Sequence, residues 1–153
     1  MATEGMMHAE VRQADGLTFM ARGASNHWVA MDTSEAGGGH GAGSSPMELV
    51  LMALGGCTGM DIVSILTKMQ QKFQGFRVEL SGERSTETPR RFTRIVVDYF
   101  LTGDAVTVES VVKAVQLSVA KYCSVGATLE PGVTLTYRYH IQRATGEESG
   151  EVV

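Results

Sequence analysis

The chain has 153 residues, of which 43% are apolar and 20% are charged, values typical of one globular domain and not of a disordered chain. Its formal net charge is −4, which argues against a nucleic-acid partner. The longest uncharged apolar run, residues 49–54, is too short for a membrane span, and the N-terminus lacks a signal-peptide pattern. These features predict a soluble cytoplasmic protein with no membrane partner.

Short strands are predicted in the first third of the chain, over residues 8–11, 17–21 and 28–31. Asp15-Gly16, between the first two, is a hairpin turn signal. The glycine-rich residues 35–45 are predicted to form a loop without regular structure.

A long helix is predicted to begin at Pro46, with Ser45 as N-cap and Glu48 at the third helical position, which together form a capping box. Apolar residues continue at helical spacing until the helix ends near Gly75. Gly55-Gly56 interrupts this pattern. Because each glycine costs a helix interior roughly 1 kcal/mol relative to alanine, a kink or restart is expected there.

The remaining pattern alternates strands with one more helix. We predict strands over 76–81, 92–101 and 133–141, a helix over 107–122, and a flexible acidic tail over 142–153. The element order β-β-β-α-β-β-α-β indicates an α+β fold built on antiparallel strands. We expect a single domain over residues 1–153, with its core between about residues 6 and 141.

Cys57 directly follows the two glycines, so a restarted helix would place it in a first turn. There, free backbone N–H groups and the helix dipole favour the nucleophilic thiolate. Asp61, one turn further on, would oppose that by raising the thiol pKa. The alternative is an inert buried thiol.

Cys123 lies at the end of the second predicted helix, and a cysteine in such a place is by itself more often a core thiol than a reactive one. The pair is more informative, since a second thiol can trap a sulfenic acid formed on the first. Spacing does not show whether the two cysteines meet.

Charged partners for a reactive thiolate are less well defined. Glu48 has a structural role in the capping box, and nine helical residues would place it on the opposite side of the helix from Cys57. A guanidinium beside the sulfur would stabilise the thiolate and orient a peroxide. Arg12 and Arg22, in the N-terminal strands, are the candidates for that guanidinium.

Other chemistries lack their motifs. The four histidines show no metal-ligand spacing, neither cysteine lies in a C-x-x-C motif, and no phosphate-binding loop or nucleophile elbow is present. We therefore expect no metal and no bound cofactor.

The two cysteine segments carry a family resemblance. SSPMELVLMALGGCTGMDIVSIL (44–66) and AVQLSVAKYCSVGATLE (114–130) closely resemble the two cysteine motifs of the OsmC/Ohr family, the osmotically inducible and organic hydroperoxide resistance proteins. Residues 16–32 and 83–95 are similar to its YhfA-like branch, and the likeness covers residues 6–141.

The resemblance implies an OsmC-like fold, in which an intertwined homodimer wraps antiparallel sheets around central helices and forms its sites at the subunit interface. By the family pattern, Cys57 matches the peroxidatic cysteine, Cys123 the resolving cysteine and Glu48 the active-site glutamate. For the family's arginine, Arg22 is the first candidate and Arg12 the second.

The predicted function is that of a thiol peroxidase that reduces organic hydroperoxides. A dithiol would serve as reductant, and the family resemblance implies that it is of lipoyl type. Two alternatives remain open at this point. One is a dithiol/disulfide reductase of other substrates, and the other is a non-catalytic dimeric protein that binds an apolar ligand.

Overall fold

The computed structural model describes residues 5–152. These residues divide into two compact units, with the boundary between Val50 and Leu51. In the N-terminal unit, β1 (Ala9–Asp15), β2 (Thr18–Gly23) and β3 (Trp28–Met31) form an antiparallel sheet in that order. Gly16 takes a left-handed φ of 53° in the β1–β2 turn, so the hairpin predicted at Asp15-Gly16 is confirmed.

A buried aspartate organises the loop that follows β3. Asp32 is 2% exposed, and its carboxylate accepts hydrogen bonds from the backbone of Thr33, His40 and Ala42 and from the Thr18 hydroxyl. Burial alone would raise its pKa, but these four donors outweigh that effect and lower the pKa to about 2. The predicted loop therefore winds around one carboxylate, and it includes a short 3₁₀ turn, η1 (Glu35–Gly37).

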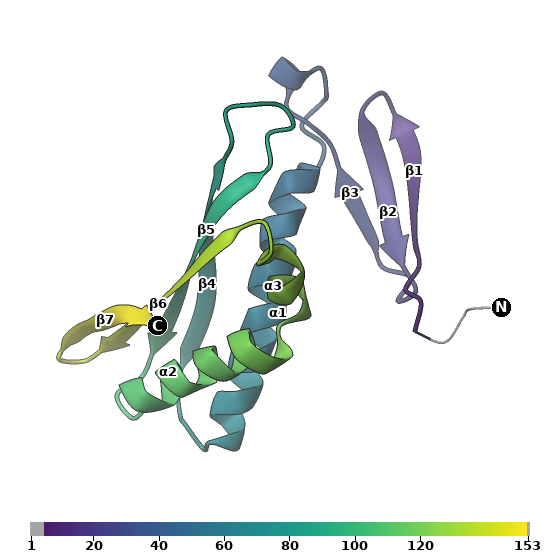
Figure 1. The fold of residues 1–153 in the computed structure, drawn as a ribbon. Coiled ribbons are helices and arrows are strands. Elements are labelled where there is room, and N and C mark those ends of the chain that lie inside the picture. Colours follow the sequence, from purple (N-terminus) through teal and green to yellow (C-terminus); the bar gives the residue numbers. More distant parts are fainter. Residues whose placement is uncertain (1–4, 153) are drawn as a thin grey trace. The chain divides into compact units, whose positions relative to one another are not determined.

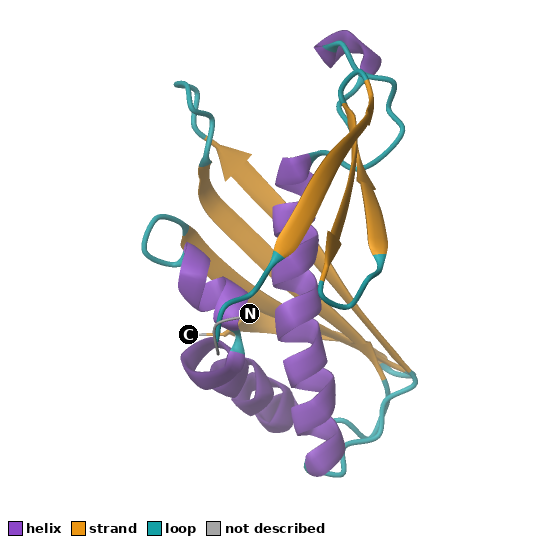
Figure 2. Cartoon of the chain, turned by 90° about the vertical axis from the view of Figure 1, so that its right-hand side faces the viewer, coloured by secondary structure: helices purple, strands orange, loops and turns teal. Residues whose placement is uncertain are grey.

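The C-terminal unit is built on a four-stranded sheet in the order β4-β5-β6-β7, covered on one face by helices (Figures 1 and 2). The chain enters this unit along α1 (Pro46–Lys68), whose first residues, through Val50, belong to the N-terminal unit. The elements that follow are β4 (Gly75–Arg84), β5 (Phe92–Thr102), α2 (Val108–Leu117), a π-helical turn η2 (Ser118–Tyr122), α3 (Ser124–Leu129), β6 (Thr134–Arg143) and β7 (Gly146–Val152). The α+β class is confirmed.

Alternate residues of β5 face the helices and form the centre of the core. Ile95, Val97, Tyr99 and Leu101 are buried, as the period of two along a strand requires. The helices contribute an apolar stripe to the same core, from Leu54, Ile62 and Leu66 of α1 and Val111, Ala114 and Val115 of α2.

One strand pair differs from the predicted antiparallel pattern. β5 and β6 pair in parallel, from Arg94↔Thr134 to Thr102↔Gln142. The reason is the connection between them, since α2, η2 and α3 carry the chain back across the sheet, and such a crossover delivers a parallel strand. The sheet is therefore mixed.

The predicted flexible tail is also wrong for most of its length. Gly146–Val152 form β7, which pairs antiparallel with β6 from Tyr137↔Val152 to Arg143↔Gly146. An edge strand is held by its backbone and tolerates polar side chains on both faces. The acidic residues that suggested a tail instead pair with β6, as Glu148 does with Arg143 at 3.1 Å.

The predicted break at Gly55-Gly56 does not occur, because α1 is one continuous helix. A Cβ on Gly55 would lie 2.6 Å from Leu80 Cδ1, and one on Gly59 would lie 3.4 Å from Val78. These glycines let α1 approach β4 closely, and that packing offsets their low helix propensity.

By length and composition, α1 is apolar enough to cross a membrane, with a mean hydropathy of 1.9. The search for an uncharged apolar run, which stopped at residues 49–54, does not detect this segment, because such a run ends at the first glycine or polar residue and a mean over 18 residues does not. The core helix of a soluble protein passes the same test, and α1 contributes six buried residues to its unit.

Candidate functional site

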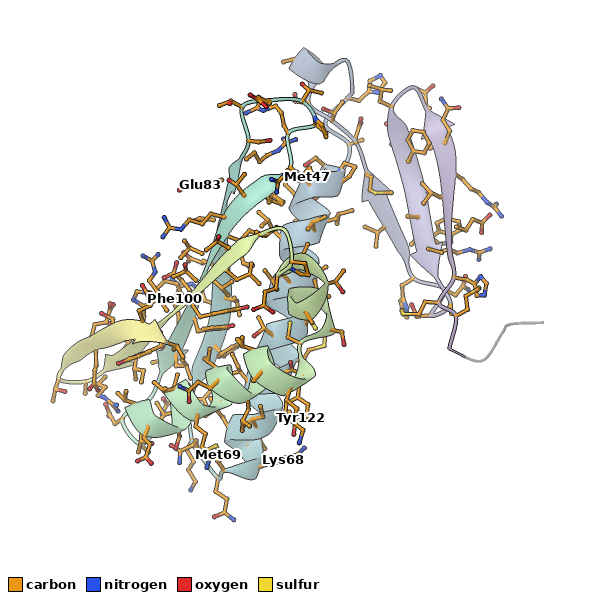
Figure 3. All side chains as sticks on the ribbon, in the orientation of Figure 1. Met47, Lys68, Met69, Glu83, Phe100 and Tyr122 are labelled. Carbon is orange, nitrogen blue, oxygen red and sulfur yellow. The ribbon has the colours of Figure 1, made fainter. Side chains whose placement is uncertain are left out.

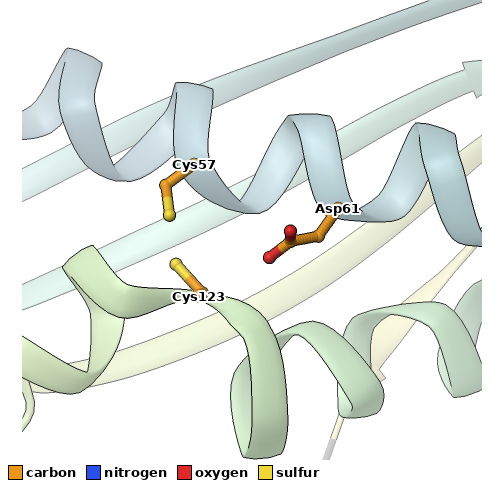
Figure 4. Close-up of side chains that lie close together, drawn as sticks. All are labelled: Cys57, Asp61 and Cys123. Atoms are coloured by element: carbon orange, nitrogen blue, oxygen red, sulfur yellow. The ribbon is translucent and has the colours of Figure 1, made fainter.

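The two cysteines, 66 positions apart in the sequence, meet in the C-terminal unit. Figure 4 shows the side chains of Cys57, Asp61 and Cys123 pointing toward one another, and both sulfurs and an Asp61 carboxylate oxygen all lie within 4.8 Å of one another. Both thiols are free. The juxtaposition that spacing alone left open is therefore present within one chain.

Cys57 lies in the interior of α1, eleven positions after Pro46, since the helix is continuous. The expected activation of this thiol by a helix N-terminus is therefore wrong, because free N–H groups and the dipole act only within the first turn. Any activation of Cys57 must come from side chains around it.

Cys123 is buried where η2 ends and α3 begins, and it is the N-cap of α3. The Gly126 backbone N–H donates to Cys123 Sγ at 3.3 Å. Burial raises the pKa of Cys123 to about 11, the Gly126 N–H opposes that rise, and the Cys57 thiol and the Asp61 carboxylate add to it. Cys123 is thus held protonated at neutral pH.

Asp61 follows Cys57 by four residues and so shares its face of the helix. Its Oδ2 accepts a hydrogen bond of 2.9 Å from the Ser118 hydroxyl of η2. The sequence signalled Asp61 only as an unfavourable neighbour of Cys57, and the structure makes it the third member of the cluster.

A buried chain of hydroxyls leads to Asp61. Tyr99 Oη lies 2.7 Å from Thr58 Oγ1, which lies 3.0 Å from Ser118 Oγ. Because the Ser118 hydroxyl donates its proton to Asp61, it accepts from Thr58, and Thr58 in turn accepts from Tyr99. Burial raises the pKa of Tyr99 further above its usual value, which keeps the first donor protonated. Nothing in the sequence pattern linked these residues.

The π-helical turn η2 aims both Ser118 and Cys123 at α1. The Cys123 backbone N–H bonds to the Ser118 carbonyl at 2.8 Å, the i→i+5 spacing of a π-turn. Such turns insert one extra residue and rotate the side chains that follow, and they are frequent at functional sites. The helix predicted over 107–122 therefore ends in a turn that positions the site.

The other predicted site residues belong to the N-terminal unit and have partners there. Glu48 forms the predicted capping box, with its carboxylate 2.7 Å from both the backbone N and the hydroxyl of Ser45, and these hydrogen bonds lower its pKa. Arg22 bonds to Glu10 at 3.0 Å and lies 4.7 Å from the Trp28 ring centroid. Arg12 also pairs with Glu10. Their catalytic roles stay predictions.

A cavity of about 350 Å³ lies beside the cluster, between α1 and the α2–η2 segment. Asp61 lies in its wall, and Figure 3 labels three of the other residues that line it, Lys68, Met69 and Tyr122. Ser64, Ile65, Lys113 and Leu117 complete the wall, and most of the exposed wall surface is apolar. An uncharged carbon chain fits such a lining.

Known proteins are similar to this chain in fold and in sequence. A family model described as "OsmC-like protein" matches residues 38–138. Protein YhfA of Escherichia coli K12 is 43% identical over 138 residues, which cover 90% of this chain and 100% of that protein. A crystal structure of a hypothetical protein from Aquifex aeolicus VF5 has a TM-score of 0.80 at 27% identity, covering 90% of this chain and 97% of that one.

More distant structures share the fold alone. The organic hydroperoxide resistance protein OsmC from Legionella pneumophila has a TM-score of 0.65 at 10% identity, covering 91% of this chain and 98% of that one. The organic hydroperoxide resistance protein from Elizabethkingia anophelis has a TM-score of 0.67 at 11% identity, covering 92% and 98%.

Proposed function

Because the chain belongs to the OsmC-like protein family, we propose that it is a thiol peroxidase that reduces organic hydroperoxides through Cys57 and Cys123. The observation that carries the proposal is the meeting of the two sulfurs, within 4.8 Å, beside a largely apolar cavity. Family neighbours named as organic hydroperoxide resistance proteins support the substrate class.

The half-buried Cys57 is the better nucleophile of the two, since Cys123 is 4% exposed and held protonated. Its thiolate attacks the terminal peroxide oxygen, the O–O bond breaks, and the alkoxide takes a proton to leave as an alcohol. Cys57 becomes a sulfenic acid.

Cys123 then attacks the Cys57 sulfur, and the hydroxyl group leaves with a proton as water. The sulfurs must close from within 4.8 Å to about 2.05 Å for the disulfide. A dithiol reductant of lipoyl type restores both thiols by exchange and carries away the two electrons. The proposed location is the cytoplasm, because a reducing compartment keeps both cysteines as thiols between turnovers, as this cycle needs.

The proposal includes charged partners and a homodimer. Arg22, with Arg12 as the alternative, would stabilise the Cys57 thiolate and orient the peroxide. Glu48, whose carboxylate would repel a thiolate, would act as the active-site glutamate through that intervening arginine. Exposed apolar side chains on α1, Met52 and Met60, at 54% and 76% exposure, suit a second copy of the chain better than water.

Steady-state turnover with cumene hydroperoxide, hydrogen peroxide and a model disulfide, each with a dihydrolipoyl reductant, tests the proposal. We expect cumene hydroperoxide to be preferred and Cys57→Ser to lose at least about 10³-fold in kcat/KM, as for removal of a nucleophile. Ser149→Ala on the exposed edge strand β7 is the control and should keep full activity. Preference for the disulfide would instead favour a disulfide reductase.

Ligand binding that persists in the Cys57→Ser/Cys123→Ser double variant, without turnover in the wild type, would favour an apolar binding protein. The oligomeric state follows from light scattering of the wild-type chain. The arginine assignment follows from Arg22→Lys against Arg12→Lys, since only the residue that touches the thiolate should alter kcat/KM.

A further inference from the structure

The donor set of the cluster is that of a metal site as well as of a redox pair. Two thiol sulfurs and one carboxylate oxygen all lie within 4.8 Å of one another, on Cys57, Cys123 and Asp61. A tetrahedral zinc ion with Zn–S near 2.3 Å and Zn–O near 2.1 Å spaces its ligands by roughly 3.5–3.8 Å. Closing the cluster onto one ion therefore requires movements on the order of 1 Å.

Two of the three ligands already have the outer hydrogen bonds that metal ligands need. The Ser118 hydroxyl bonds to Asp61 Oδ2 at 2.9 Å, which leaves Oδ1 available. The Gly126 N–H bonds to Cys123 Sγ at 3.3 Å, as backbone donors do to metal-bound thiolates. Such contacts fix ligand orientation and raise affinity.

The cluster also has negative charge to neutralise. None of the salt bridges between residues 5–152 involves Asp61. With both thiols ionised the three ligands carry three negative charges, and a divalent ion compensates two of them. Thiolate ligands select a soft or borderline ion such as Zn²⁺ over Mg²⁺ or Ca²⁺.

We propose that the reduced protein binds one Zn²⁺ ion through Cys57 Sγ, Cys123 Sγ and a carboxylate oxygen of Asp61, with the fourth position open to water or an external ligand. Binding replaces two thiol protons, so Zn²⁺ and two R–SH give Zn(SR)₂ and two H⁺. Half-buried Cys57 and Asp61 leave a way in for the ion.

Zinc and peroxide compete for the same sulfurs. The disulfide has no thiolate to offer, so oxidation expels the ion, and bound zinc withholds Cys57 from the peroxide. This regulatory consequence rests on the proposed peroxidase function, whereas metal binding itself rests only on the cluster.

Zinc titration of the reduced, chelator-stripped full-length protein, in competition with a chromophoric chelator, tests the site. We expect one equivalent per chain and loss of at least about 100-fold in affinity for Cys57→Ser and for Cys123→Ser, and at least about tenfold for Asp61→Asn, because each removes a ligand. Glu109→Gln, an exposed acidic residue of α2, is the matched control. Asp61→Glu, which keeps the carboxylate, should recover part of the affinity.

Cobalt(II) provides an independent readout through its thiolate charge-transfer absorption, which we expect in the wild type and not in either cysteine variant. Unchanged zinc affinity in Asp61→Asn, or binding that survives loss of a cysteine, would overturn the proposed ligand set. Zinc binding without any oxidation of Cys57 by cumene hydroperoxide would support the metal site and reject the peroxidase. Peroxidase activity without zinc binding would support the peroxidase and reject the metal site.

Discussion

Asp32 in the N-terminal unit and Asp61 in the C-terminal unit have opposite surroundings. In the N-terminal unit, four hydrogen-bond donors converge on the carboxylate of Asp32, which is 2% exposed and has its pKa lowered to about 2. In the C-terminal unit, Asp61 is half-buried, accepts one hydrogen bond among those between described residues, from Ser118, and faces two thiols. A carboxylate with all its acceptor sites used holds a loop together, whereas one with free acceptor sites beside sulfur is available for chemistry.

The largest effect should separate the roles of the two thiols in the C-terminal unit. With Cys123→Ser, we expect steady-state peroxide turnover to fall by at least about 100-fold, because a sulfenic acid without its resolving thiol is not recycled efficiently. The first equivalent of peroxide should still oxidise Cys57, as trapping with dimedone would show. Full turnover in Cys123→Ser would mean that an external thiol resolves Cys57 directly.

The hydroxyl chain that ends at Asp61 should matter to stability. Thr58→Val keeps the shape of the side chain but leaves Tyr99 and Ser118 without their buried partner. The expected cost in the free energy of unfolding is about 1–3 kcal/mol, measured by urea denaturation. Thr67→Val, on the exposed side of the same helix, is the control and should cost clearly less. Equal losses of unfolding free energy in Thr58→Val and Thr67→Val would show that the buried hydroxyl chain stabilises the fold no more than an exposed hydroxyl does.

The Asp32 loop should show its effect in acid. The folded pKa is about 2 against an ordinary 3.8, so the ionised carboxylate stabilises the fold above about pH 4. That contribution is lost as the pH falls from about 4 toward 2. Asp32→Asn should therefore be less stable than the wild type at neutral pH, and the difference in melting temperature should shrink through that window.

Asp15→Asn, at the exposed end of β1, is the control for Asp32→Asn and should follow the wild-type pH profile. A difference between Asp32→Asn and the wild type that stays constant from pH 6 to about pH 2 would contradict the assigned role.

The smallest effect concerns the helix that carries Cys57 and Asp61. A Cβ on Gly56 would meet no atom within 4 Å, whereas one on Gly55 would lie 2.6 Å from Leu80 Cδ1. In a continuous helix, Gly56→Ala should stabilise the chain by about 0.5–1 kcal/mol, and Gly55→Ala should gain less because Leu80 must move. Urea denaturation of the two variants measures the difference, and destabilisation by Gly56→Ala would indicate a break in α1.

Local signals predicted much of the fold. The Asp15-Gly16 turn and the Ser45–Glu48 capping box each depend on residues close together in the sequence, and the structure confirms both. The break at Gly55-Gly56 was wrong because the contact with Leu80 that compensates it lies 25 positions away in the sequence. The strand β7 was missed because its stability comes from backbone pairing with β6, which leaves no apolar pattern.

The site was predictable only in part. The cysteines were identified by their motifs, but their meeting depends on a π-turn that no spacing rule foretells. Asp61 could be identified one turn from Cys57, but its hydrogen bond comes from the Ser118 hydroxyl, 57 positions away in the sequence. The absence of C-x-x-C spacing excluded a zinc ribbon, but it could not exclude ligands brought together by tertiary structure.

Peptide mass mapping of the reduced full-length protein, before and after one equivalent of cumene hydroperoxide, tests the central claim most directly. We expect a fast, stoichiometric crosslink between the peptides that contain Cys57 and Cys123, and none in Cys57→Ser. Two thiols that remain reduced and fully alkylatable after the peroxide is added would contradict it.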